Sequence, residues 1–284
     1  MRSVYAVIGY PIGHTMSPFI HRRLFALSGR DVDYQTVEIV PENLNAELPR
    51  LMRGAEGVNV TIPHKQAVIP LLSRLEGAAA RYQTVNCIAV RGNEAVGYNT
   101  DADGAVLALR DAGRKLSGDV ALIGAGGAAK ALACEMALAG CRITNAVRDA
   151  DVEAGKQLGQ LARQLAPGTS YHVVTLDQLE AETSRFDLLF NATPVGMHPH
   201  PGVSPVTENT VSRCSFIFDL VYNPGETHLL QLAKGRGVPG LGGMPMLVWQ
   251  AAAAHKIWYG GAFAPADVWQ IIKDAQAEMG NHSS

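Results

Sequence analysis

Several features that define common protein classes are scarce or missing in this sequence of 284 residues. Its 24 basic and 26 acidic side chains give a formal net charge of −2, so there is no basic excess to bind nucleic acid or an anionic membrane. No apolar run approaches the ~18 residues needed to cross a bilayer. The N-terminal run Val4–Ile8 stops at Gly9 without a signal-peptide cleavage pattern. These absences predict a cytoplasmic protein with a small-molecule substrate and with neither nucleic acid nor membrane as a partner.

Patterns typical of metal sites and disulfides are also missing. Cys87, Cys134, Cys141 and Cys214 have no CxxC spacing, and in a cytosolic chain such cysteines are typically reduced core residues. The nine histidines contain no HxxxH pair. We therefore expect no metal, and we expect a monomer or a homodimer.

What the sequence does contain is the strand–helix alternation of an α/β protein. Strands and helices are predicted in turn at residues 3–9, 18–27, 32–40, 42–53 and 59–65. This βαβαβ start indicates a mostly parallel, doubly wound sheet. The pattern then continues with a kinked helix at 66–75, a strand at 82–90 and a helix at 105–111.

The stretch Gly57–Lys65 carries the first candidate catalytic residue. Apolar and polar residues alternate along it until Pro63 stops the strand, which places Lys65 at the strand's carboxyl end. Ligands of open α/β sheets collect at that end, so an amine there can face a substrate. The alternative is a solvated lysine beside a turn.

Polar residues near Lys65 in the predicted sheet offer possible partners. Asn86 lies at the polar entry of a strand, where it can also simply satisfy backbone groups. Asp101 or Asp103 can cap the helix that follows, which leaves the other carboxylate free. If Asp101 faces Lys65, the carboxylate orients the ammonium and the pair can give or take a proton.

Two hydroxyl residues lie on the loop between the first strand and the first helix. Ser17 is placed to cap that helix, with Pro18 at its first position. Thr15 and Ser17 are also suitable donors for a polyhydroxy or carboxylate ligand.

A glycine-rich loop in the second half predicts a dinucleotide site. The buried strand Val120–Ile123 leads into Gly124-Ala125-Gly126-Gly127-Ala128-Ala129 and an alanine-rich helix, which fits G-x-G-x-x-G/A. Gly124 makes the tight turn and Gly126 lets the backbone approach a pyrophosphate. Ala129 allows close packing of the helix on the strand.

The tip of the next strand should lie near the adenosine ribose, and it is chemically ambiguous. It holds Val147-Arg148-Asp149. An acid here would bind a free 2′-hydroxyl, whereas an arginine would accept a 2′-phosphate. Arg148 favours NADP and Asp149 would repel its phosphate, so NADP is expected and NAD stays possible.

The C-terminal part is helical, which sets the predicted domain limits. Helices at 246–259 and 265–279 have no strand between them and are expected to fold back on the first domain. We therefore predict a substrate-binding domain over residues 1–103, completed by helices at 246–284, and a Rossmann-type NAD(P)-binding domain over residues 104–245. Gln250 on the returning helix is, taken alone, an ordinary polar residue.

Taken together, eight sequence blocks from residue 4 to about 272 resemble the shikimate dehydrogenase family in order and approximate spacing. The blocks are Gly9-x-Pro11-x-x-His14-Thr15-x-Ser17-Pro18-x-x-His21, Asn59-Val60-Thr61-x-Pro63-x-Lys65, Val85-Asn86, Asn99-Thr100-Asp101-x-x-Gly104, Gly124-x-Gly126-Gly127-Ala128, Asn191-Ala192-Thr193-Pro194-x-Gly196-Met197, Asp219-x-x-Tyr222-x-Pro224 and Met246-Leu247-Val248-x-Gln250-Ala251.

The resemblance implies reversible reduction of 3-dehydroshikimate to shikimate with NADPH, a step in chorismate and aromatic amino-acid biosynthesis. It implies that Lys65 is the acid/base with Asp101 beside it. The residues implied around the substrate are Thr15, Ser17, Thr61, Asn86, Tyr222 and Gln250. Those implied around the cofactor are Gly124 to Ala129, Arg148, Thr193, Leu220 and Gly243.

The chain also departs from the family pattern. The family usually has Ser at Thr15, Asn at Arg22, a small residue at Gln83, and Asn-Arg-Thr where this chain has Val147-Arg148-Asp149. The extra methyl of Thr15 is worth about 1–3 kcal/mol of discrimination between ligands. A relative that acts on quinate or another cyclitol acid with NAD or NADP is therefore an alternative. A non-catalytic nucleotide-binding regulator is a third possibility, against which the presence of Lys65 and Asp101 counts.

Overall fold

The computed structural model describes residues 2–13 and 15–282, so His14 of the first motif lies outside the described residues. The chain forms two compact units. Unit 1 contains Met1–Gly104 and Val248–Ala275, and unit 2 contains Ala105–Leu247 and Gln276–Ser284. The predicted α/β class is confirmed, as is the return of the C-terminal helices to the first unit.

Unit 1 is built on one mixed six-stranded sheet in the order β2-β1-β3-β5-β6-β4. Its strands are β1 (Ser3–Gly9), β2 (Val32–Glu38), β3 (Gly57–Val60), β4 (Arg74–Leu75), β5 (Cys87–Arg91) and β6 (Glu94–Tyr98). Its helical elements are α1 (Ser17–Leu27), η1 (Pro41–Asn43), α2 (Leu44–Met52), η2 (Ile69–Leu71), α3 (Ala78–Tyr82), the start of α4 (Asp101–Asp111), and most of α10 (Met244–Tyr259) and α11 (Pro265–His282). β1 pairs in parallel with β2 and β3, whereas β5 is antiparallel to β3 and β6.

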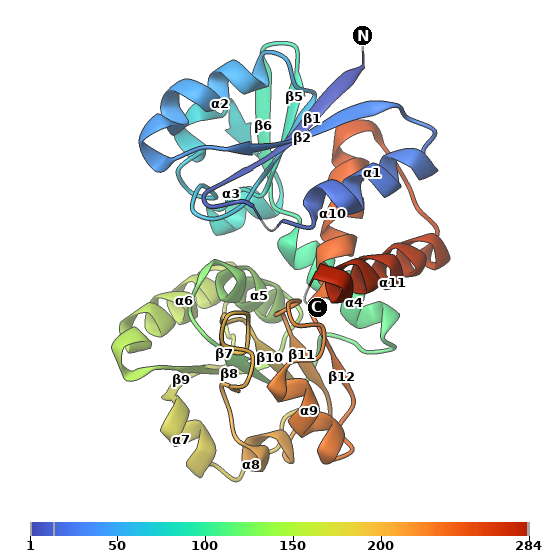
Figure 1. Cartoon of the computed structure of the whole chain (residues 1–284). Helices are drawn as coiled ribbons and strands as arrows, with labels where there is room; N and C mark the ends of the chain where they lie inside the picture. Colours follow the sequence, from blue (N-terminus) through green and yellow to red (C-terminus); the bar gives the residue numbers. More distant parts are fainter. Residues whose placement is uncertain (1, 14, 283–284) are drawn as a thin grey trace. The chain divides into compact units, whose positions relative to one another are not determined.

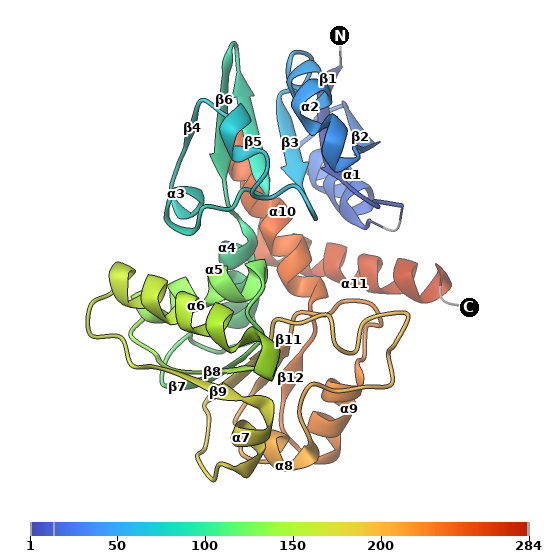
Figure 2. The ribbon, with the colours of Figure 1, turned by 90° about the vertical axis from the view of Figure 1, so that its left-hand side faces the viewer.

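Both faces of this sheet are covered by helices (Figure 1). On one face α2 and α3 pack on an aliphatic cluster that includes Ile8, Leu48 and Ile88. On the other, α1 and α10 pack on an aromatic cluster that includes Tyr5 and Trp258. Figure 2 shows α10 passing behind β3 and β5, and the Nε1–H of Trp258 donates to the Ile88 carbonyl at 3.0 Å. A Cβ at residue 57 would lie 2.4 Å from that nitrogen, so this close approach requires Gly57.

Unit 2 is a parallel six-stranded sheet in the order β12-β11-β10-β7-β8-β9. Its strands are β7 (Asp119–Ile123), β8 (Arg142–Val147), β9 (Tyr171–Thr175), β10 (Leu188–Asn191), β11 (Ile217–Asp219) and β12 (Gly240–Leu241). Its helical elements are α5 (Gly127–Leu138), η3 (Asp149–Asp151), α6 (Val152–Leu165), α7 (Leu176–Ala181), α8 (Glu208–Val211) and α9 (His228–Gly235).

The strands of unit 2 have the 3-2-1-4-5-6 order of the dinucleotide-binding fold. α5 and α6 cover one face of the sheet, and α7, α8 and α9 lie on the other (Figure 1). The strand order reverses between β7 and β10, and ligands of such sheets bind outside the carboxyl ends of the strands at this point. The prediction of a Rossmann-type sheet is confirmed.

Local predictions between residues 59 and 98 were less accurate. β3 ends at Val60, and Ile62 is 73% exposed rather than continuing the strand. The helix expected at 66–75 is instead a turn, the short η2 and the strand β4, because Pro70 interrupts a helix and β4 pairs with β6.

The strand expected at 82–90 begins only at Cys87. Tyr82 ends α3, and Gln83 follows in the left-handed conformation with φ 53. A glycine adopts this conformation most readily, whereas residues with a side chain rarely do. The β5–β6 hairpin, which turns at Gly92, was not predicted, because no element was assigned between the strand expected at 82–90 and the helix expected at 105–111.

The helices of the described chain, residues 2–13 and 15–282, include none that is both long and apolar enough to span a membrane.

A buried pair of histidines joins α1 to α10 in unit 1. His21 Nδ1 and His255 Nε2 are 2.9 Å apart, and His255 Nδ1 is 2.6 Å from the hydroxyl of Tyr259. Both imidazoles are fully buried, and His21 Nε2 has no hydrogen-bond partner among the described residues. Burial lowers the pKa of His255 to about 3 and also lowers that of His21. Both rings are therefore neutral in the folded protein at physiological pH.

Stability is expected to fall as the pH drops below about 6.5, because the unfolded chain then binds protons at these histidines and the folded chain does not. His255 alone should account for a loss of about 2 kcal/mol between pH 7 and pH 5. The measurement is urea unfolding at both pH values, for the wild type and His255→Gln. The variant should lose less stability over this range, whereas His172→Asn, which removes an exposed histidine, should behave as the wild type. An unchanged pH dependence in His255→Gln would contradict the assignment.

Candidate active site

Lys65 lies on a turn just beyond the carboxyl end of β3, and the backbone around it is fixed from two sides. The buried ring of His64 is hydrogen-bonded through Nε2 to the Ile39 carbonyl at 2.7 Å. The carbonyl of Lys65 accepts the N–H of Val85 at 2.7 Å. The base of the lysine is therefore held in place, and its long side chain leads to the amine.

Asp101 is the first residue of α4, and its carboxylate faces Lys65. Nζ of Lys65 donates to Oδ2 of Asp101 at 2.6 Å, with the two side chains 30% and 16% exposed. The structure thus brings together the two residues predicted to act as an acid–base pair. Neither aspartate occupies the predicted N-cap position, because α4 already begins at Asp101 and both carboxylates lie in its first turn. The N–H of Asp101 donates to Oδ1 of Asn99.

Asn86 connects this pair to the helix that returns from the C-terminal part. Its amide nitrogen donates to Oδ1 of Asp101 at 2.8 Å and lies 3.4 Å from Oε1 of Gln250. Its amide oxygen accepts the N–H of Thr100 at 2.7 Å, and the Thr100 hydroxyl lies 3.3 Å from Gln250 Oε1. Asn86 and Gln250 are both buried, so the polar groups around the carboxylate satisfy one another away from bulk water.

The predicted substrate hydroxyls of the first loop form a separate group. The hydroxyl of Thr15 donates to that of Ser17 at 3.1 Å and accepts the Ser17 N–H at 3.2 Å. The prediction that Ser17 caps α1 was wrong, because Ser17 is inside the helix and Met16 precedes it without a side-chain cap. Thr61 follows β3, and its N–H donates to the Ile8 carbonyl.

Three residues that support the pair were not predicted from the sequence, namely His64, Asn99 and Thr100. Each lies in a motif that the sequence showed, but its partner is distant in the chain. Asn99, for example, donates from its amide to the carbonyl and hydroxyl of Thr84. The sequence feature that could have identified these residues is their position, because each is a polar residue within two positions of Lys65 or Asp101.

The glycine loop of unit 2 has the geometry that a phosphate group requires. Gly124 has φ +106, and a Cβ there would lie 2.7 Å from Thr193 Cγ2, so the turn requires glycine. α5 begins at Gly127, and its N-cap residue Gly126 supplies no side-chain hydrogen bond to the first turn. A Cβ at Gly126 or Gly127 would meet no described atom within 4 Å. Open space in front of uncapped helix N–H groups suits a bound pyrophosphate.

The other predicted cofactor residues follow the carboxyl ends of neighbouring strands. Arg148 follows β8, Thr193 follows β10, and Leu220 follows β11. Gly243 precedes α10 against the Leu220 carbonyl, where a Cβ would come within 2.1 Å of the oxygen. Tyr222, predicted to bind substrate, lies in unit 2, and burial raises the pKa of its phenol.

A buried polar network that the sequence did not reveal shapes these loops. The carboxylate of Asp219 is fully buried and accepts from Asn191, Thr227 and the N–H of Val221. Oδ1 of Asn191 in turn accepts the N–H and hydroxyl of Thr193. The loops after β10 and β11 are therefore bound to one another.

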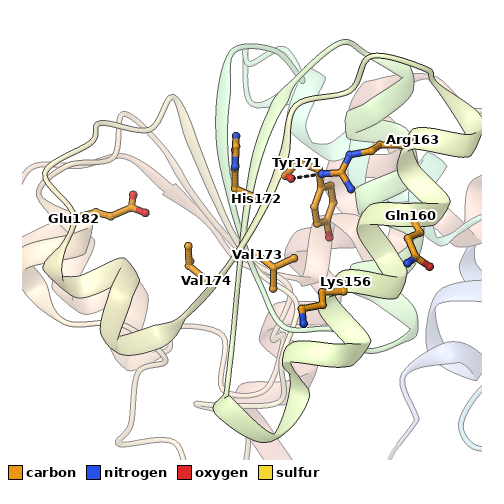
Figure 3. Close-up of a pocket in the computed structure, with 8 residues that line it drawn as sticks. All are labelled: Lys156, Gln160, Arg163, Tyr171, His172, Val173, Val174 and Glu182. Carbon is orange, nitrogen blue, oxygen red and sulfur yellow. Dashed lines mark hydrogen bonds between the residues drawn. The ribbon is translucent and has the colours of Figure 1, made fainter.

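A cavity of about 580 Å³ lies elsewhere in unit 2, between α6 and the edge strand β9 (Figure 3). It is lined by Lys156, Gln160, Arg163, Tyr171, His172, Val173, Val174 and Glu182. It contains none of the predicted site residues. No group of three or more His, Cys, Asp or Glu side chains in residues 2–13 and 15–282 is arranged to hold a metal ion.

A doubly wound sheet with a glycine cradle is a fold for dinucleotides, and an amine held by a carboxylate can exchange a proton. Fold and site therefore define an NAD(P)-dependent oxidoreductase. Residues 7–88 match the family model described as shikimate dehydrogenase substrate binding domain. Shikimate dehydrogenase (NADP(+)) of Moorella thermoacetica is 35% identical over 272 residues, covering 95% of this chain and 92% of that protein. The chain belongs to the shikimate dehydrogenase family.

Solved structures agree with this result. A crystal structure of shikimate dehydrogenase in complex with NADP+ has a TM-score of 0.88 at 34% identity, covering 96% of this chain and 95% of the other. Shikimate 5-dehydrogenase from Thermus thermophilus, in complex with NADP(H) and shikimate, has a TM-score of 0.85 at 30% identity. It covers 96% of this chain and 99% of the other.

Gly126→Ala is expected to leave folding intact and to weaken nucleotide binding. The added methyl meets no protein atom within 4 Å, but it occupies the space in front of the α5 N-terminus. Calorimetric titration with NADP+ should show a dissociation constant raised at least ~10-fold, with an unchanged unfolding midpoint. Gly202→Ala, also without a contact within 4 Å, is the control. Equal affinity in both variants would show that the cradle is not the phosphate site.

Proposed function

We propose that this chain catalyses the reversible, NADP-dependent reduction of 3-dehydroshikimate to shikimate, in the biosynthesis of chorismate and the aromatic amino acids. The observation that carries the proposal is the 2.6 Å ion pair of Lys65 and Asp101, in the unit that contains the matched substrate-binding domain. The relatives compared above are named for shikimate, which favours this substrate over quinate. The presence of the acid–base pair counts against a non-catalytic regulator.

The chemistry divides between the nucleotide and the protein. NADPH, when bound, supplies a hydride to the carbonyl carbon of the substrate. Lys65 then gives a proton to the oxygen, and its ammonium neutralises negative charge as this charge develops. Asp101 keeps the amine in position through Oδ2, while its Oδ1 is occupied by Asn86. In the reverse direction, Lys65 takes the proton from the hydroxyl.

Substrate recognition is assigned to a set of polar side chains. We propose that the carboxylate and hydroxyls of the substrate bind Thr15, Ser17, Thr61, Asn86, Gln250 and Tyr222. The raised pKa of Tyr222 supports a phenol that keeps its proton and donates at neutral pH. Thr15 carries a methyl group that a serine would lack, and this group restricts the ligand on that side.

The nucleotide is assigned to unit 2. We propose that residues 104–245 form the NADP-binding domain, and that residues 1–103, completed by 246–284, form the substrate-binding and catalytic domain. The pyrophosphate would lie against Gly124 to Ala129, and Arg148 would face the adenosine. Leu220 and Gly243 would lie near the nicotinamide, and Thr193 would also contact the cofactor.

We further propose that the protein works in the cytoplasm as a monomer or a homodimer. All four cysteines are free and buried, as is typical of proteins in a reducing compartment. The large exposed hydrophobic side chains in the described chain come from several separate loops and helices, which favours a small assembly.

Lys65→Ala is expected to lower kcat by about 10² to 10⁴, because it removes the proton donor and the charge that stabilises the forming alkoxide. Binding of shikimate, measured by calorimetry, should remain detectable, since several other polar groups contact the substrate. Lys234→Ala serves as the matched control, because Lys234 also pairs with a carboxylate, Glu226, at 3.3 Å. Unchanged turnover in Lys65→Ala would refute the assignment of the acid/base.

Asn99→Ala is expected to lower kcat by ~10 to 100-fold with little change in KM, because Asp101 would lose the group that fixes its backbone. Asn99→Ser keeps a short acceptor at this position and should recover part of the loss. Asn209→Ala, which removes an exposed amide that donates to the Glu180 carbonyl, is the control. An effect confined to KM would contradict the positioning role.

A further inference from the structure

A fully buried asparagine lies inside the sheet of unit 2. Asn145 belongs to β8, which runs between β7 and β9, and its side chain has no exposed surface. Burying an amide costs free energy unless its polar atoms find hydrogen-bond partners. The contacts of this side chain therefore show what the amide does in the fold.

The amide nitrogen of Asn145 connects β8 to the end of β7. Nδ2 donates to the carbonyl of Leu122 at 2.9 Å and to that of Gly124 at 2.8 Å. Both neighbours are acceptors, which fixes the orientation of the amide. The pairing of β7 with β8 ends at Ile123 and Ala146, so the Gly124 carbonyl lies beyond the paired residues. The side chain of Asn145 thus supplies a donor where the strand pairing has ended.

This contact fixes the first residue of the glycine loop, Gly124 to Ala129. The N–H of Gly124 donates to the Ala146 carbonyl at 2.9 Å. Its α-carbon faces Thr193, where a Cβ would come within 2.7 Å of Cγ2. With the carbonyl bound to Asn145, all three backbone groups of Gly124 are held. The next peptide is planar and trans, so its N–H points away from Asn145, and the direction in which the chain leaves β7 for α5 is set.

Helix α6 leaves room for this asparagine. A Cβ at Gly155 would lie 3.1 Å from Oδ1 of Asn145 and 2.9 Å from Cγ1 of Val173, so the close approach of α6 requires a glycine. Oδ1 of Asn145 has no hydrogen-bond partner among the described residues. An apolar side chain of similar size would fill this space without leaving an oxygen unpaired. The two hydrogen bonds donated by the nitrogen are therefore what the amide contributes.

We propose that Asn145 is a positioning residue for nucleotide binding, which holds the Gly124 carbonyl and so keeps the glycine loop in the conformation that receives the pyrophosphate of NADP. The inference rests on the proposed function and adds a residue that acts through the loop without touching the ligand. A loop that is held before the ligand arrives loses less conformational entropy on binding.

The test compares two substitutions of Asn145 in the full chain. Asn145→Leu keeps a side chain of similar size and removes both donated hydrogen bonds. Asn145→Thr suits a strand and keeps one hydroxyl donor. Calorimetric titration gives the dissociation constant of NADP+, and steady-state kinetics with shikimate and NADP+ give KM and kcat.

Asn145→Leu should raise the dissociation constant and the KM of NADP+ about tenfold, as the loss of a hydrogen bond of ordinary strength implies. The kcat at saturating NADP+ and the KM of shikimate should change by less than about twofold. Asn145→Thr should lie between Asn145→Leu and the wild type. A purely structural role predicts the opposite split, because partial unfolding lowers the apparent kcat and leaves the KM of the folded enzyme unchanged.

Thr210→Val is the matched control. Thr210 is also a fully buried polar residue of unit 2, but it lies in α8 and accepts from Arg213 at 2.8 Å. This variant should have a lower unfolding midpoint and an unchanged dissociation constant for NADP+. An equal loss of affinity in Thr210→Val and Asn145→Leu would refute the positioning role.

A change of less than about twofold in the dissociation constant of NADP+ in Asn145→Leu would also overturn the inference. If Asn145→Leu does not fold, Asn145→Thr decides alone by the same criterion, because one carbonyl still lacks its donor. A wild type that binds NADP+ but does not turn over shikimate would contradict the proposed function, and the binding measurements would still decide the role of Asn145.

Discussion

The ion pair between Lys65 and Asp101 is the interaction on which the rest of unit 1 depends for its chemistry. A lysine side chain has many rotamers, and ordering it costs conformational entropy. Here the turn that carries it is held through His64, and the carboxylate is held through Asn86 and Asn99. The amine is therefore positioned by hydrogen bonds that exist before any ligand arrives, as electrostatic preorganisation requires.

In both units, buried polar side chains hold the loops at the ends of the strands in place. In each, a buried polar side chain connects loops at the ends of strands, Asn86 in unit 1 and Asp219 in unit 2. A buried polar group that lacked partners would cost several kcal/mol, so such a network has few alternative arrangements. These loops thus gain order from the core, although they belong to no helix or strand.

The fold class and the glycine loop could be predicted from local patterns of the sequence, whereas the pairing of Lys65 with Asp101 was implied by the resemblance to the family. The sequence was insufficient for β4, β6 and the support by Asn99. β4 has two residues, and its existence depends on its pairing with β6. The partner of Asn99 is Thr84, which no periodicity connects to it. The ion pair of Arg148 with Asp151 could not be predicted either, because it depends on the side-chain rotamer of an exposed arginine.

The return of α10 to unit 1 has a consequence for how the protein is made. Trp258 fills one face of the first sheet and Gln250 completes the hydrogen bonds around Asn86 and Thr100, yet both residues follow the whole of unit 2's sheet in the chain. During translation, the amino-terminal sheet leaves the ribosome with its aromatic face covered by α1 but not yet by α10. More than half of the polypeptide is synthesised between this sheet and the end of α10. Unit 2 can therefore fold before unit 1 is complete.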